Sequence, residues 1–350
     1  MSIQRIGVLT SGGDAPGMNA AVRSVVRTAI SRGIEVMGVY RGYHGLIRDE
    51  VEPLELRSVA DIIHRGGTML YTARSESFRL EEGVRKGVDI CTKHGIEGLV
   101  CIGGDGTFRG AQDLCRHGIP CIGIPATIDN DISCCQHTIG FDTALNTCVE
   151  MFDKLRDTAQ SHDRVSLVEV MGRRSGELAL GVGLAVGATA ILVPEMKFDL
   201  VAIIDRIKAI SATGKKHFII VVAEGVGGTV EMAEKIQAAT GAEARATILG
   251  HVQRGGSPTA FDRKMASEMG HHAVELLIAG KSNRVVASQD DMIRDYDIEQ
   301  ALSMRKPFPS DQYDIAKELY LIGESFSAIS RRSPLDGHIY INKHRKAVSQ

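Results

Sequence analysis

The sequence lacks the features that mark membrane, nucleic-acid and secreted proteins. Its 350 residues include 41 Lys or Arg and 43 Asp or Glu, so the formal net charge is only −2. A protein that coats nucleic acid or a membrane surface would be more basic. No apolar run reaches the roughly 18–20 residues that span a bilayer, and glycine and aspartate interrupt the first apolar stretch too early for a signal peptide. We expect neither a membrane nor a nucleic-acid partner.

Cysteine and sequence repeats are also sparse. The seven cysteines form no CxxC pair, which argues against a structural zinc site, and Cys134 and Cys135 are simply adjacent. We therefore expect reduced thiols in a cytoplasmic protein. No period of 20–50 residues recurs, which excludes a solenoid. Hydrophobic residues make up 43% of the chain, enough for a large core, and the length suggests two or three domains.

Apolar runs that alternate with helical patterns predict an α/β fold. Each run is short, rich in β-branched residues and continuously apolar, which is typical of parallel strands covered on both faces. Strand–helix alternation favours parallel sheets with right-handed crossovers. The predicted strands are 5–10, 98–103, 121–126, 165–171, 189–195, 217–225 and 245–252, and helical segments include 19–31, 143–157 and 200–213.

Ligands bind beyond the carboxyl ends of the strands in such sheets. The residues that follow each apolar run are therefore the candidates for a site. They are 10–14, 103–107, 127–131, 171–173, Glu224 and 251–254.

Two of these segments are glycine clusters suited to phosphate. TSGGDAPGMNAA (10–21) and IGGDGTF (102–108) remove side chains where a strand turns into a helix, so backbone N–H groups can approach a phosphate. Asp105 in the second cluster would repel phosphates unless a cation lay between them, and Mg²⁺ is the natural choice. PATIDND (125–131) would add a base and a further carboxylate beside this site.

Five motifs in order resemble the bacterial-type ATP-dependent 6-phosphofructokinases. They are TSGGDAPGMNAAVR, IGGDGTF, TIDND, VEVMGR and GHVQRGGSP, and the match runs from about Arg5 to Tyr320. GGDGT alone also occurs in NAD kinases and diacylglycerol kinases, but these give no reason for the two later motifs. The resemblance implies a glycolytic enzyme that transfers the γ-phosphoryl group of MgATP to the 1-hydroxyl of fructose 6-phosphate. It also implies two Rossmann-like three-layer domains with the active site in the cleft between them.

The resemblance assigns roles to matching residues. Asp129 resembles the catalytic base, Thr127 and Arg173 resemble groups that hold the transferring phosphoryl, and Asp105 resembles the Mg²⁺ ligand. The implied nucleotide contacts are Gly12, Arg74, Ser75, Gly104, Asp105, Gly106 and Thr107. The implied sugar-phosphate contacts are Thr127, Ile128, Asp129, Arg164, Met171, Gly172, Arg173, Glu224, Arg245, His251, Val252, Gln253 and Arg254, of which Arg164 and Arg245 would reach in from a neighbouring subunit of a homotetramer.

Alternatives to this function remain at the level of sequence. Pyrophosphate-dependent relatives typically carry Asp at position 106 and Lys at 126, so Gly106 and Ala126 favour ATP. Ser75 replaces a frequent aromatic residue, which predicts looser selection of the base. A catalytically inactive nucleotide sensor is the third possibility, although Asp105, Asp129 and Arg173 are all retained.

An effector site for ADP or phosphoenolpyruvate is a further implication of the resemblance. The matching basic residues are Arg23, Arg27, Arg156, Lys215 and Lys216. Thr189 and Thr213 stand where a glutamate and an arginine are common, and Leu56 replaces another arginine. Because charge-assisted contacts are lost, we expect weakened or altered allosteric regulation.

The expected domain division follows from the same comparison and from a break near 138–142. An ATP-binding domain would comprise 1–139 and about 253–305. A fructose 6-phosphate-binding domain would comprise 140–252 and about 306–325. Residues 326–350 lose the pattern and are expected to form a surface tail.

Overall fold

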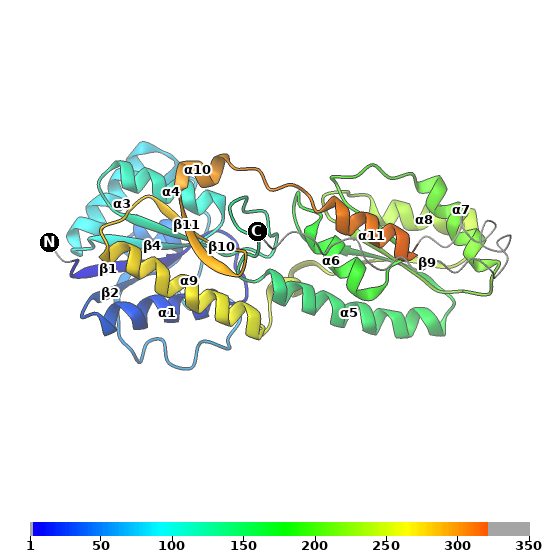
Figure 1. The fold of residues 1–350 in the computed structure, drawn as a ribbon, viewed down its shortest axis with the longest axis horizontal. Coiled ribbons are helices and arrows are strands. Elements are labelled where there is room, and N and C mark those ends of the chain that lie inside the picture. The colour runs from blue at the N-terminus through cyan, green and yellow to red at the C-terminus, as the bar shows by residue number, and fades with distance from the viewer. Residues whose placement is uncertain (1–2, 321–350) are drawn as a thin grey trace, which may run out of the picture.

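Two lobes lie side by side along the long axis of the molecule (Figure 1). The structure is a computed structural model that describes residues 3–320. The expected surface tail at 326–350 lies outside these residues. No helix in the described part of the chain is long and apolar enough to cross a membrane.

The larger lobe is built on a seven-stranded sheet of order β11-β10-β5-β4-β1-β2-β3. Its central strands are parallel, whereas β3 and β11 pair antiparallel at the two edges. The strands are β1 (Arg5–Thr10), β2 (Glu35–Val39), β3 (Val51–Leu54), β4 (Gly98–Gly103), β5 (Cys121–Pro125), β10 (Arg284–Gln289) and β11 (Met292–Asp297). All six residues of β4 are buried, which is why its sequence is continuously apolar.

Helices cover both faces of this sheet. α1 (Met18–Ser31) and α9 (Ala260–Ile278) pack against each other on one side, and α3 (Glu81–Lys93) and α4 (Asp105–Arg116) lie on the other (Figure 1). The shorter helices of this lobe are α2 (Gly42–Leu46), α10 (Ile298–Ser303) and the 3₁₀ turn η1 (Ser77–Arg79). The result is the three-layer arrangement that the resemblance implied.

The smaller lobe carries a four-stranded parallel sheet of order β7-β8-β6-β9. Its strands are β6 (Val165–Val170), β7 (Ala190–Leu192), β8 (Phe218–Ala223) and β9 (Ala244–Ile248). Its helices are α5 (Phe141–Ser161), α6 (Glu177–Val186), α7 (Leu200–Ser211), α8 (Thr229–Thr240), α11 (Ser310–Tyr320) and the 3₁₀ turn η2 (Gly250–Arg254). The predicted domain division assigns all strands of each sheet to one domain.

The chain passes between the lobes three times. It crosses after β5 into α5, again between η2 and α9, and finally through 304–309, the extended segment that joins α10 to α11 (Figure 1). The carboxyl ends of β4 and β5 therefore lie next to crossings that lead to the smaller lobe.

The α/β prediction is confirmed, and the seven predicted strands all form. Three predicted strands are clearly too long. β7 has only three residues, β8 spans six of the nine predicted, and β9 ends at Ile248, just before η2. The predictions omitted β2, β3, β10 and β11. β11 (MIRDYD) is only partly buried and polar, so it lacks a continuous apolar run.

Candidate active site

The two glycine loops predicted at the ends of β1 and β4 lie against each other. The Thr107 hydroxyl donates a hydrogen bond to the Ser11 carbonyl oxygen over 3.1 Å. A Cβ at Gly103 would lie 2.3 Å from that same carbonyl and 2.4 Å from Oγ1 of Thr107, so only glycine fits there. Gly12 has φ +94°, a conformation that favours glycine. Both loops thus form one glycine-lined surface.

Helix α4 begins at this surface. Gly104 is its N-cap residue and Asp105 is the acidic residue of its first turn. The free N–H groups and the dipole of a helix N-terminus favour an anion such as a phosphate. In the described part of the chain, nothing lies within 4 Å of a Cβ built on Gly106, so the space beside α4 is open.

Asp129 is a buried carboxylate that follows β5. Its exposed fraction is 7%, and its Oδ1 has no hydrogen-bond partner among residues 3–320. Burial raises the pKa of Asp129 to about 6, and the nearby charges of Asp131 and Glu224 add to this, whereas Arg254 and Arg173 oppose it. A carboxylate with a raised pKa and a free oxygen is suited to accept a proton.

The carboxylates from β4 and β5 share one region with Arg173. Burial and the charge of Asp131 raise the pKa of Asp105, and Arg109 and Arg173 oppose that rise. Burial also raises the pKa of Asp131, and the charges of Arg173 and Lys306 oppose that rise. The charge of Arg173 thus lowers the pKa of Asp105, Asp129 and Asp131 alike, so Arg173 lies within electrostatic range of all three carboxyl groups.

The smaller lobe presents Arg173 and Glu224 from the carboxyl ends of β6 and β8. Gly172 and Arg173 both have positive φ, 135° and 59°, which turns the chain sharply after β6. The Arg173 backbone N–H donates to Oε1 of Glu224. This contact fixes the turn that carries Met171, Gly172 and Arg173.

Arg254 joins the two lobes from η2. Its Nη1 donates to the Asp14 carbonyl oxygen over 3.0 Å, and a Cβ at Gly13 would lie 2.5 Å from the same nitrogen. His251 and Val252 lie on the same turn. Arg254 therefore packs directly on the first glycine loop.

Ile128 and Gln253, which were predicted to contact the substrate, have buried side chains that pack inside the protein. Ile128 is fully buried. Gln253 is also fully buried, and its Oε1 accepts from the Met171 N–H over 3.0 Å and from the Cys148 thiol over 3.2 Å. Its Nε2 donates to the Gly250 carbonyl oxygen. The Gln253 side chain thus orients Met171 and, being fully buried, is not accessible to a ligand.

Arg164 and Arg245 are not brought to this site. Both lie at the amino ends of their strands, and both pair with Glu243, at 3.0 and 2.7 Å. Strand β6 has six residues, so Arg164 is separated from its carboxyl end by about 20 Å. Within one chain they therefore lie away from Arg173 and Glu224.

Arg74 and Ser75 lie on a loop that is fastened to β1 and the first glycine loop. The Thr10 hydroxyl donates to the Tyr71 carbonyl oxygen over 2.7 Å, and the Thr72 hydroxyl donates to that of Gly12 over 2.8 Å. The Ser75 Oγ accepts from the Phe78 N–H, so its hydroxyl already has a local role. Thr72 was not predicted from the sequence.

The expected effector residues fall into two groups within one chain. The charge of Arg156 and burial both lower the pKa of Lys215, with burial the larger cause, so these two side chains are neighbours. Lys216 pairs with Asp163. Arg23 and Arg27 lie on α1 in the larger lobe. The two groups thus belong to different lobes.

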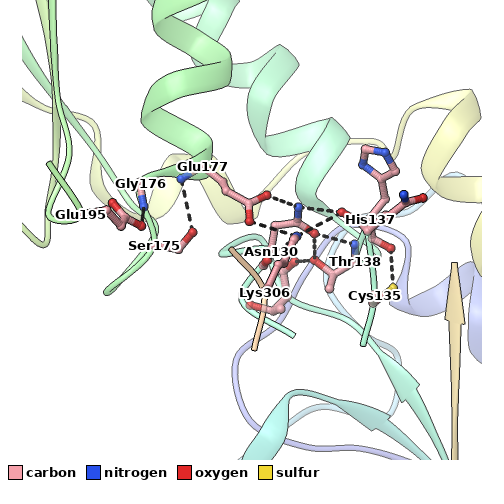
Figure 2. Close-up of polar contacts among 11 residues, drawn as sticks. Asn130, Cys135, His137, Thr138, Ser175, Gly176, Glu177, Glu195 and Lys306 are labelled. Carbon is pink, nitrogen blue, oxygen red and sulfur yellow. Dashed lines mark hydrogen bonds and ion pairs between the residues drawn. The ribbon is translucent and has the colours of Figure 1, made fainter. Parts of the chain in front are cut away.

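A polar network around Asn130 connects the lobes, and the sequence did not predict its other two members, Lys306 and Glu177 (Figure 2). Lys306 comes from the 304–309 crossing, Glu177 from α6, and Asn130 from the turn after β5. A cavity of about 190 Å³ lies here, lined by Asp131, Ser133, Arg174, Ser175, Glu177, Glu195, Lys306 and Phe308. Asn130 belongs to the PATIDND motif, whereas Lys306 and Glu177 lie in no motif, because their partners are far away in the sequence.

The carboxylates fit a magnesium ion that is held jointly with a ligand. Within residues 3–320 no group of three His, Cys, Asp or Glu side chains could hold a metal by itself. Mg²⁺ commonly uses one or two carboxylates together with phosphate oxygens and water. Asp105, whose pKa is raised by burial and by the charge of Asp131, is suited to such a role.

The fold and these loops define a two-lobed α/β protein with paired glycine loops and a buried carboxylate at the cleft. The family model described as phosphofructokinase matches residues 5–277. The chain is 57% identical over 317 residues to the ATP-dependent 6-phosphofructokinases of Bacillus thuringiensis (strain Al Hakam) and Bacillus cereus (strain AH187), across 91% of this chain and 99% of each relative. The chain belongs to the phosphofructokinase family.

Solved structures agree with this membership. The phosphofructokinase of Saccharomyces cerevisiae is 31% identical with a TM-score of 0.83, over 90% of this chain and 50% of that chain, so our chain spans half its length. A pyrophosphate-dependent phosphofructokinase from Marinobacter aquaeolei has a TM-score of 0.79 at 22% identity, over 91% of this chain and 92% of that chain, and shows the shared fold.

Proposed function

We propose that this protein transfers the γ-phosphoryl group of MgATP to the 1-hydroxyl of fructose 6-phosphate, giving fructose 1,6-bisphosphate and ADP. The observation that carries the proposal is the buried Asp129, whose unpartnered Oδ1 lies in the same charged region as Asp105 and Arg173. The 57% identity to proteins named ATP-dependent 6-phosphofructokinase supports this donor and acceptor.

Asp129 acts as the base in this proposal. The Oδ1 atom of Asp129 accepts the proton of the sugar 1-hydroxyl while the hydroxyl oxygen attacks the γ-phosphorus of ATP. General-base catalysis contributes about 10²–10⁴-fold. Thr127 and Arg173 hold the transferring group, and a guanidinium at developing charge contributes on the order of 3–4 kcal/mol, judged from comparable donors.

The glycine loops and Asp105 receive the nucleotide. Backbone N–H groups at the start of α4, together with Gly12 and Thr107, face the phosphates, and Arg74 contacts the nucleotide from its loop. Asp105 holds Mg²⁺ through a carboxylate oxygen. When bound, the ion supplies positive charge between two anionic substrates.

The sugar phosphate lies between the lobes. Glu224, Met171, Gly172, His251, Val252 and Arg254 contact it from one chain, and Gln253 acts by orienting Met171. Arg164 and Arg245 bind its 6-phosphate from a second chain, because both lie at the amino ends of their strands, opposite the carboxyl ends that carry the other contacts. This geometry supports active sites that are shared between chains, and the family resemblance suggests that the chains form a homotetramer. The effector site proposed for ADP or phosphoenolpyruvate would likewise form between chains.

The choice of donor rests on the second glycine loop. The space at Gly106 leaves room for a nucleotide, and Ala126 places no cation toward a pyrophosphate. A coupled assay that supplies fructose 6-phosphate with either ATP or pyrophosphate tests the proposal. We expect turnover with ATP and magnesium. Turnover with pyrophosphate alone would assign the chain to the other donor class, and no turnover with either donor would overturn the proposed function.

A further inference from the structure

Lys306 occupies an unusual place, in the last of the three crossings between the lobes. The segment 304–309 leaves α10 in the larger lobe and enters α11 in the smaller one (Figure 1). The Lys306 side chain nevertheless points back and is only 19% exposed. A buried lysine must use its three N–H donors, so its acceptors show what it fixes.

Three oxygens surround the ammonium group of Lys306. Its Nζ donates to the carbonyl oxygens of Asn130 over 2.9 Å and Gln136 over 3.2 Å, and it lies 3.0 Å from Oε1 of Glu177 (Figure 2). Asn130 and Gln136 belong to the turn after β5, whereas Glu177 begins α6 in the smaller lobe. One side chain thus connects the third crossing, the turn and α6.

Asn130 is held on every side by the same network. Its Nδ2 donates to Oε2 of Glu177 over 2.6 Å and to the Gln136 carbonyl oxygen over 2.9 Å. Its Oδ1 accepts from the Thr138 N–H over 2.9 Å. Asn130 is 1% exposed and has φ +51°, a conformation that requires support in a residue other than glycine.

The position of Asn130 in the sequence links this network to two aspartates of the site. Asn130 stands between Asp129 and Asp131, so a shift of its backbone would move both carboxylates. Glu177 is 15% exposed; burial raises its pKa, and the ion pair with Lys306 opposes that rise. Without Lys306, a buried carboxylate and two carbonyl oxygens would all lose their common donor.

We propose that Lys306 is a positioning residue that holds the 129–131 turn against α6 and thereby sets the place of Asp129 relative to Arg173. This inference rests on the proposed phosphoryl transfer. It does not require Lys306 to touch either substrate. Its effect is therefore confined to the step in which Asp129 must lie close to the attacking oxygen.

The test compares Lys306→Met, Lys306→Arg and the double variant Lys306→Met/Glu177→Gln. The matched control is Lys264→Met, because Lys264 is a 78% exposed lysine of a helical ion pair with Glu268. For Lys306→Met we expect kcat to fall about 10–100-fold, as is usual for residues that orient a reactive group. The KM values for both substrates should stay close to those of the parent, because an interaction needed only in the transition state lowers kcat.

The double variant separates positioning from folding. It removes both charges of the ion pair, so its unfolding midpoint should recover toward that of the parent, while its kcat stays low because the Asn130 carbonyl oxygen still lacks its donor. Lys306→Arg should regain most of the lost turnover. The inference is overturned if the double variant regains parental kcat, if Lys306→Met turns over like Lys264→Met, or if KM rises with kcat unchanged. Loss of turnover in the parent itself would instead refute the proposed function.

Discussion

Replacing Asp129 by asparagine should make the protein more stable and much less active. Burial raises the pKa of this carboxyl group from 3.8 to about 6. Because the folded chain holds the proton more tightly than the unfolded chain, ionisation of Asp129 costs stability as the pH rises from about 4 to about 6. Two pKa units correspond to about 3 kcal/mol, an upper bound on the cost, which is complete above about pH 6.

The assay measures unfolding by urea at pH 4 and pH 7.5, without magnesium or nucleotide, since ligands that bind the folded state stabilise it. The Asp129→Asn variant should exceed the parent by up to about 3 kcal/mol at pH 7.5 and match it near pH 4. Asp89→Asn is the control, because Asp89 is an exposed carboxylate on α3. A neutral residue there should change little at either pH.

Kinetics supply the other half of the test. Turnover of Asp129→Asn should fall by about 10²–10⁴-fold. The kcat/KM of the parent should decline as the pH falls below about 6, because it reports ionisation of the base in the free protein. A variant that is no more stable than the parent at pH 7.5, or a parental kcat/KM that is flat from pH 7.5 to 5, would refute the reasoning about this carboxylate.

Two further predictions use other residues of the site. Arg245→Ala should raise the KM for the sugar phosphate far more than that for ATP and leave stability within about 0.5 kcal/mol, because Arg245 is 66% exposed. Arg116→Ala, which removes an equally exposed pair with Asp113, is its control, and equal effects on both substrates would argue against a 6-phosphate clamp. Gly103→Ala should cost about 1–3 kcal/mol of stability, since its Cβ would strike Ser11 and Thr107. Gly106→Ala should leave stability unchanged or raise it by up to about 1 kcal/mol, because Gly106 lies on α4 with open space around it. The same substitution should raise the KM for ATP. A Gly103→Ala protein as stable as the Gly106→Ala protein would show that the glycine loops are not closely packed.

The sequence predicts the strands around the site because their apolar runs are local. β1 and β4 have the bounds expected from the sequence, and the polar residues beyond them converge as the rule for parallel sheets requires. The β10–β11 hairpin escaped prediction. Its turn uses Asp290 and Asp291 with positive φ, and β11 is polar and only partly buried. The apolar run of β10 is only three residues long, Val285 to Ala287, although it is fully buried.

The sequence predicts which residues follow the strands but not how deeply the structure buries them. The sequence suggests that Asp131 raises the pKa of Asp129 and that arginines lower it, and both directions are confirmed. The largest cause is burial, which depends on packing and has no local signature. The Lys306 network is non-local too, since its ammonium group binds residues 170 and 176 positions away.

The placement of Arg164 and Arg245 at the amino ends of their strands has a consequence for assemblies that contain two different variants of this chain. If each cleft receives Arg164 and Arg245 from another chain, a variant that lacks Asp129 still contributes both arginines to a neighbouring cleft. A variant that lacks Arg245 still has Asp129 in its own cleft. Two preparations that are separately inactive at low sugar phosphate would then regain activity once their subunits are exchanged, because some of the hybrid clefts combine both unaltered halves.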